Sequence, residues 1–204
     1  LPSLEEIGVQ ISIVKPDNNG IIKAQSIKNE IRSNTKLISI MWVNNELGTI
    51  NNINEIGQLS LDNNIKFHTD GVQALGKIPI NLKKIKINFI SMSAHKLYGP
   101  KGVGALYVKK GESLKPLIHG GSQESNLRAS TENISGIGGF GLATEKAINN
   151  MHINCNKILT LEKYFIESLN KKHLDYKING INRVPGVFNI TFNNFDGQSL
   201  VLQL

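Results

Sequence analysis

The sequence contains very little cysteine: Cys155 is the only one among its 204 residues. An intramolecular disulfide is therefore excluded, and so is a metal site built from several cysteines of one chain. A single thiol fits a reducing compartment, such as a cytoplasm or an organelle matrix. Cys155 stands between two asparagines, and no sequence neighbour supplies a base or a fixed cation to activate it. We interpret it as a structural thiol.

Long hydrophobic runs and long blocks of like charge are also absent. No apolar stretch is long enough to cross a bilayer as a helix, so we expect no membrane partner. Lys and Arg outnumber Asp and Glu by 23 to 16, which gives a formal net charge of +7, but the basic residues are scattered. Because no aromatic-interleaved basic stripe is present, we expect no direct contact with nucleic acid. The excess charge is interpreted as a solvated surface that favours an anionic ligand.

Neither end has the features of a natural terminus. Residues 1–6 contain no basic region followed by an apolar core, as a signal peptide would, and no initiator methionine. The last residues stop inside an apolar run. We therefore expect the chain to be an internal fragment of a longer protein.

Short apolar segments alternate with helical ones along the first 150 residues. Strands are expected at residues 9–14, 36–43, 65–69, 89–93 and 103–108, and a helix at 24–31. Asn52 followed by Glu55 resembles a capping box at the start of another helix. The run 36–43 is almost continuously apolar, which predicts a strand buried on both faces. This order predicts an α/β domain with a mainly parallel sheet.

The pattern changes towards the C-terminus. Two long helical segments, the first over residues 134–151, precede short strands expected at 176–178 and 187–192. We predict that residues 1–150 are part of a large domain and that 151–204 begin a small α+β C-terminal domain. Residues 136–141 match G-x-G-x-x-G, with Glu162 at a suitable distance, but no strand leads into them. We interpret these glycines as a means of close helix packing.

Polar residues follow three of the expected strands, at 44–46, 70–73 and 93–96. Ligands of parallel sheets bind beyond the carboxyl ends of the strands. Lys96 supplies an amine able to form a Schiff base, Asp70 a carboxylate for a ring nitrogen, and Ser93 and His95 supply phosphate donors, which together are the groups that pyridoxal phosphate (PLP) requires. Taken singly, each has an ordinary alternative: a turn, a solvated lysine or a structural histidine.

Longer motifs around these residues favour the PLP site over these ordinary alternatives. They are Met-Trp-Val-Asn-Asn-Glu-Leu-Gly at 41–48, His-Thr-Asp-Gly-Val-Gln at 68–73, and Ser-Ala-His-Lys-Leu-Tyr-Gly-Pro-Lys-Gly-Val-Gly-Ala-Leu-Tyr at 93–107. Residues 119–124 and 127–131 continue the match. In order and spacing, the chain resembles the NifS/IscS type of cysteine desulfurase, a class V, fold-type I PLP enzyme, over essentially its whole length.

The resemblance implies a PLP-transferase-like large domain and a role for each matching residue. Lys96 would be the Schiff-base lysine and a proton shuttle. Asp70 would contact the pyridinium nitrogen, Gln73 the phenolate oxygen, and Ser93 and His95 the phosphate. Asn45 would lie beside the ring and the substrate carboxylate, and Thr131 would contact the phosphate of the other subunit's cofactor. The last contact implies a homodimer. No metal ligand is implied.

The implied reaction converts L-cysteine to L-alanine and passes the sulfur to an enzyme cysteine as a persulfide. Its partners would be the acceptor and scaffold proteins of iron–sulfur cluster assembly and of tRNA thiolation. Cys155 does not match the family's persulfide cysteine, and the loop that carries that cysteine has no counterpart here. We therefore expect this chain alone not to complete sulfur transfer. The alternatives are another class V PLP enzyme, namely a selenocysteine lyase or an aminotransferase, or a non-catalytic truncated paralogue that only dimerises or binds partners.

Overall fold

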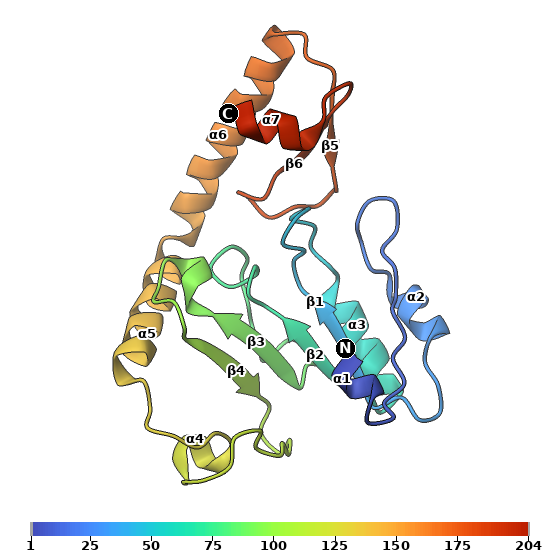
Figure 1. The fold of residues 1–204 in the computed structure, drawn as a ribbon, viewed down its shortest axis with the longest axis vertical. Coiled ribbons are helices and arrows are strands. Elements are labelled where there is room, and N and C mark those ends of the chain that lie inside the picture. The colour runs from blue at the N-terminus through green and yellow to red at the C-terminus, as the bar shows by residue number, and fades with distance from the viewer. Residues whose placement is uncertain (1, 204) are drawn as a thin grey trace.

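The computed structural model describes residues 2–203, and its larger sheet has four strands in sequence order (Figure 1). These strands are β1 (Leu37–Met41), β2 (Lys66–Asp70), β3 (Phe89–Ser93) and β4 (Gly104–Val108). The pairs β1–β2 and β2–β3 are parallel, whereas β3–β4 is antiparallel. The predicted α/β class with a mainly parallel sheet is confirmed.

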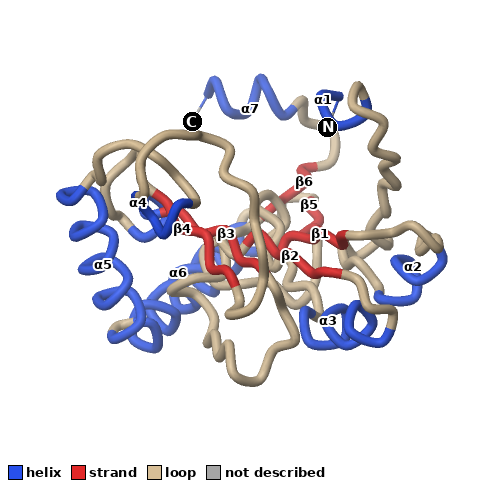
Figure 2. Tube along the Cα trace, turned by 90° about the horizontal axis from the view of Figure 1, so that it is seen from below, coloured by secondary structure: helices blue, strands red, loops and turns tan. Residues whose placement is uncertain are grey.

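Three of the helices around this sheet were predicted: α2 (Ala24–Asn29), α3 (Ile53–Asp62) and α5 (Ile134–Asn149). Three short ones were not: α1 (Pro2–Glu5), the 3-10 helix η1 (Ala94–Leu97) and α4 (Gln123–Asn126). The start of α3 is the one predicted: the Asn52 side chain accepts a hydrogen bond from the Glu55 backbone N–H and donates one to the Glu55 carboxylate. Figures 1 and 2 show α3 beside β1 and β2, and α5 near the β4 end of the sheet.

The core lies between the sheet and α3. Ile56, Phe67 and Ile90 are fully buried there. On the opposite face of β1, Leu37 is 53% exposed and Ser39 is also accessible. The prediction that this strand is buried on both faces is therefore wrong, because within residues 2–203 helix α3 packs on one face only.

Residues 9–14 form an extended segment but no strand, so the strand predicted there is wrong. The side chains of this segment make contacts, but its backbone pairs with no strand within residues 2–203. Val14 packs against the core. The Arg32 guanidinium donates hydrogen bonds to the side chains of Gln10 and Ser12, both over 3.0 Å.

A second lobe follows at the end of a long helix, α6 (Met151–Lys171) (Figure 1). It contains the antiparallel pair β5 (Tyr176–Asn179) and β6 (Asn189–Phe192), and α7 (Gly197–Gln203). Its hydrogen bonds to the loop after β1 run from Ile50 N to Asn182 O (3.0 Å) and from Val184 N to Gly48 O (2.9 Å). The division into domains at residue 150 stays a prediction. Of the helices that the structure describes, none has the length and apolar character needed to span a membrane.

Candidate functional site

The carboxyl ends of β2 and β3 lie side by side because the two strands are parallel. Asp70, the last residue of β2, pairs in register with Ser91 of β3. Two residues further, Ser93 ends β3, and η1 then presents His95 and Lys96, both exposed. The Ser93 hydroxyl and His95 Nδ1 form a hydrogen bond of 2.6 Å. A carboxylate, a hydroxyl, an imidazole and an amine are therefore gathered along one edge of the sheet.

The turn after β2 positions Gln73 beside this edge. The Asp70 carboxylate accepts a hydrogen bond from Val72 N over 2.9 Å, and Gly71 N donates to Ser91 O over 2.9 Å. These contacts fold the chain back, so that Gln73 is only 7% exposed. Its Oε1 accepts a hydrogen bond from Lys77 Nζ.

Helix η1 packs against α5. A Cβ at Gly139 of α5 would lie 2.6 Å from Pro100 Cγ, so this glycine permits the close packing that the sequence predicts. The same does not hold for Gly138 or Gly141, where a Cβ would meet nothing within 4 Å. Tyr98 ends η1 in the left-handed conformation (φ 61°), a strained state for a bulky residue two positions after Lys96.

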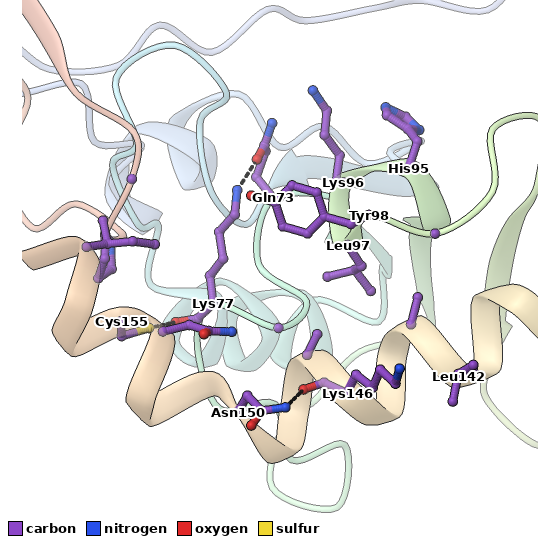
Figure 3. A pocket seen from close by; sticks show the side chains of 18 of the residues that line it. Gln73, Lys77, His95, Lys96, Leu97, Tyr98, Leu142, Lys146, Asn150 and Cys155 are labelled. Carbon is purple, nitrogen blue, oxygen red and sulfur yellow. Dashed lines mark hydrogen bonds between the residues drawn. The ribbon is translucent and has the colours of Figure 1, made fainter.

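A cavity of about 830 Å³ borders the site between η1, α5, α6 and the second lobe. Its basic side chains include Lys77, Lys96 and Lys146, and no carboxylate is found among the described residues that line it. Figure 3 shows the polar ends of Gln73, Lys77, Lys96 and His95 pointing to the same side, away from the helices below them. Such a wall favours an anionic ligand.

Burial and neighbouring charge change two titratable groups here. Burial, followed by the positive charge of Lys96, lowers the pKa of the Lys77 ammonium. Burial also lowers the pKa of His68, and the nearby Asp70 acts in the opposite direction. The His68 side chain links three neighbouring strands. Its Nδ1 is hydrogen-bonded to the Ser39 hydroxyl of β1 and its Nε2 to the Ser91 hydroxyl of β3, each over 2.8 Å.

The structure gathers most of the predicted site residues but not all of them. Gln73, His95 and Lys96 line the cavity, and Asp70 and Ser93 lie at the adjoining strand ends without lining it. Asn45 is exposed in the loop after β1, which the Asn44 side chain shapes by accepting from Glu46 N and Leu47 N.

Thr131 is exposed in the segment between α4 and α5 and does not line the cavity. The sequence-based role of this residue required a second subunit. The roles of Asn45 and Thr131, like those of the other predicted site residues, stay predictions.

Sequence reasoning missed Lys77 and His68. Lys77 is four residues after Gln73, a spacing that places two side chains on one side of a helical turn. His68 is two residues before Asp70 and so shares its face of the strand. Both periodicities were available as signals. Cys155 lines the far part of the cavity, where its thiol donates to the Lys77 carbonyl over 3.6 Å.

Comparison with known proteins gives consistent relatives. The protein named cysteine desulfurase IscS of Dictyoglomus turgidum is 45% identical over 203 residues, which cover 98% of this chain and 52% of the relative. The protein of the same name from Plasmodium falciparum is 45% identical over 207 residues, which cover 98% of this chain and 37% of the relative. The chain thus spans about half the length, or less, of these curated relatives.

Solved structures agree in fold. A NifS-like protein superposes with a TM-score of 0.92 at 34% identity and covers 98% of this chain, which spans 55% of that protein. A structure described as SspA in complex with cysteine gives a TM-score of 0.84 at 37% identity, covering 99% of this chain and 56% of the other. The aminotransferase class V family matches residues 3–204. Because that match includes almost every residue, this chain belongs to the aminotransferase class V family.

Proposed function

We propose that this chain forms the PLP-binding part of a cysteine desulfurase. The observation that carries the proposal is the convergence of Lys96, Asp70 and Gln73 at the carboxyl ends of adjacent parallel strands. Members of the class V aminotransferase family depend on PLP, and the proteins most like this chain in sequence include several named cysteine desulfurase.

The residues present fit PLP in their chemistry. The exposed Lys96 carries a primary amine, which can hold an aldehyde reversibly as a Schiff base. Asp70 is an acceptor for a protonated ring nitrogen. The Ser93–His95 pair and the lysine-rich cavity wall suit a phosphate. The cavity volume of about 830 Å³ also lies within the range of ligand sites.

Each residue then has a defined task in the proposed reaction. PLP supplies the electron sink for bond breaking at the substrate Cα. Lys96 Nζ would hold the cofactor and would carry a proton from the substrate Cα. Asp70 would keep the ring nitrogen protonated by accepting its hydrogen bond, and Gln73 would donate to the phenolate oxygen. Ser93 and His95 would bind the phosphate and fix the position of the ring.

The overall proposed reaction is L-cysteine plus an enzyme thiol to L-alanine plus an enzyme persulfide, which balances in atoms and electrons. The substrate is supported by the similar protein SspA, whose structure is described as a complex with cysteine. Cys155 is not proposed as the sulfur acceptor, because its thiol bonds to a backbone carbonyl in the far part of the cavity. The acceptor thiol would come from a part of the whole protein outside this chain.

The assembly and location of the whole protein are part of the same proposal. Thr131 is exposed and outside the cavity, which fits a contact with a second subunit in a homodimer. The proposed location is the cytoplasm or an organelle matrix; one relative, from Arabidopsis thaliana, is named as a mitochondrial cysteine desulfurase. Sulfur-acceptor and scaffold proteins of iron–sulfur cluster assembly would be its partners.

Borohydride trapping tests the cofactor site directly. The chain is mixed with PLP, reduced with borohydride, digested and mapped by mass spectrometry. We expect one pyridoxyl adduct, on Lys96. Lys96→Ala should abolish the adduct, whereas Lys101→Ala, at an exposed lysine of the same segment, should leave it intact. No adduct, or adducts spread evenly over surface lysines, would contradict the proposal.

A further inference from the structure

Lys77 is a second lysine beside the proposed cofactor lysine. It lines the same cavity as Lys96 and is close enough for the charge of Lys96 to contribute to lowering its pKa. Its Nζ lies 2.5 Å from Oε1 of Gln73. Of the ion pairs that residues 2–203 form, none includes Lys77. A half-buried ammonium with an amide as its hydrogen-bond partner needs an explanation, because burial disfavours the charged form.

The contact determines which way the Gln73 amide faces. A side-chain amide has one end that accepts hydrogen bonds and one end that donates them, and the two are hard to distinguish by shape. A lysine ammonium has only donors, so the oxygen of Gln73 must face Lys77. The NH2 group then faces the other way. Figure 3 shows this nitrogen at the tip of Gln73, on the side to which Lys96 also points.

The orientation matters because the proposed task of Gln73 is to donate. With its NH2 group facing the site, Gln73 can donate to an anionic oxygen of the ligand. With the amide reversed, a carbonyl oxygen would face that anion and repel it. Gln73 is 7% exposed, so its side chain has little solvent to satisfy a reversed amide. The neighbouring residue that removes the ambiguity is Lys77.

We propose that Lys77 is a positioning residue that holds the Gln73 amide with its NH2 group towards the cofactor phenolate. This inference rests on the proposed function, since it assigns an orientation to the residue expected to contact that oxygen. Lys77 itself does not touch the reacting atoms. Its segment is anchored by backbone hydrogen bonds from Lys77 N and Ile78 N to Ala74 O, both over 3.0 Å, so its position relative to Gln73 is well defined.

One alternative is that Lys77 acts only through its positive charge. The other titratable groups facing the same cavity are Lys96 and His95 on η1, Tyr98 at the end of η1, Lys146 on α5 and Cys155 on α6. Removing Lys77 removes one charge from this set whatever Gln73 does. A charge effect does not need Gln73, whereas a positioning effect exists only while Gln73 is present. A double-mutant cycle therefore separates the two.

The experiment compares Lys77→Met, Gln73→Ala and the double variant with wild type and with Lys101→Met, which removes a charge from an exposed lysine. The readouts are the Kd for PLP and the pH midpoint of the absorbance change of the bound chromophore. We expect Lys77→Met to weaken PLP binding about 3- to 10-fold, the net effect of one hydrogen bond. It should also raise the pH midpoint, because the phenolate loses a donor. Lys77→Arg, which keeps the donors, should stay within about twofold of wild type.

In the Gln73→Ala background, the Lys77→Met change should have almost no further effect on either readout. An equal effect in both backgrounds would overturn the positioning role in favour of charge alone. Wild-type Kd and midpoint in Lys77→Met would also overturn it. Far-ultraviolet circular dichroism of each variant shows whether it is folded, and Lys77→Arg provides the folded comparison should Lys77→Met fail to fold.

A measurement without cofactor separates this inference from the proposed function. In the cofactor-free chain, the Gln73 side-chain amide signal, identified by its loss in Gln73→Ala, should shift in Lys77→Met and not in Lys101→Met. A shifted amide in a chain that takes up no PLP would overturn the proposed function and leave the contact as a purely structural one. An unshifted amide in a chain that binds PLP on Lys96 would overturn the positioning role alone.

Discussion

The packing of the turn after β2 against η1 and α5 can be tested at Gly76. This residue has φ of +73°, and a Cβ there would lie 2.8 Å from Leu97 Cδ2 and 2.9 Å from Ala147 Cβ. The Leu97 methyl is on a buried side chain, and the Ala147 Cβ is attached rigidly to the α5 backbone. Gly76→Ala must therefore push the turn, η1 and α5 apart.

The expected cost has two parts. An alanine with a left-handed backbone costs about 1–2 kcal/mol. Forcing an extra methyl into a packed contact costs about 1–3 kcal/mol more. Gly102 provides a matched control, since its φ is +77° but a Cβ there would meet nothing within 4 Å. We expect Gly102→Ala to lose about 1–2 kcal/mol of unfolding free energy and Gly76→Ala about 2–5 kcal/mol.

Urea unfolding followed by circular dichroism measures both values. The difference between the two variants isolates the packing cost from the backbone cost. Ala147→Gly should cost about 1 kcal/mol alone, as glycine does in a helix, but less in the Gly76→Ala background, where it removes one of the two collisions. Because η1 carries Lys96, PLP affinity should fall in Gly76→Ala and not in Gly102→Ala. Equal losses of stability in Gly76→Ala and Gly102→Ala would refute the packing argument.

Three further predictions concern the fold around the site. Burial lowers the pKa of His68 in the folded chain below the ordinary histidine value of about 6.5. The unfolded chain therefore binds more protons just below pH 6.5, and stability should decrease as pH falls through that value. Urea midpoints between pH 5 and 8 should show a smaller decrease in His68→Gln, but an unchanged one in the exposed control His119→Gln. Asn52→Ala removes the cap of α3 and should lower the unfolding free energy by about 1 kcal/mol in the same assay. An unchanged unfolding free energy would show that this cap does not stabilise the helix. Gly141→Ala, in a helix with open space around it, should stabilise the chain by about 0.5–1 kcal/mol, and a loss of stability there would show a contact that the structure lacks.

Local patterns in the sequence were enough to determine much of this protein. The strands of the larger sheet, the capped start of α3 and the long helices follow from hydrophobic periodicity and capping chemistry, which act between residues close in the chain. The rule that ligands bind beyond the carboxyl ends of parallel strands then selected Asp70, Gln73 and Lys96. Their identity as a possible cofactor site came from motifs rather than from periodicity, since each residue alone also fits a turn or a solvated side chain.

Other features depended on contacts between distant residues. Whether the apolar pattern of residues 9–14 becomes a strand depends on a partner strand, which the structure does not provide within residues 2–203. The exposed face of β1 depends on which elements cover it, and the tie between Gly48 and Val184 joins segments far apart in the chain. Gln73 and Lys77 are close in the chain, but the position of Lys96 beside them required η1 to be placed against the turn after β2. Periodicity describes which face a side chain occupies, whereas only tertiary packing decides what that face meets.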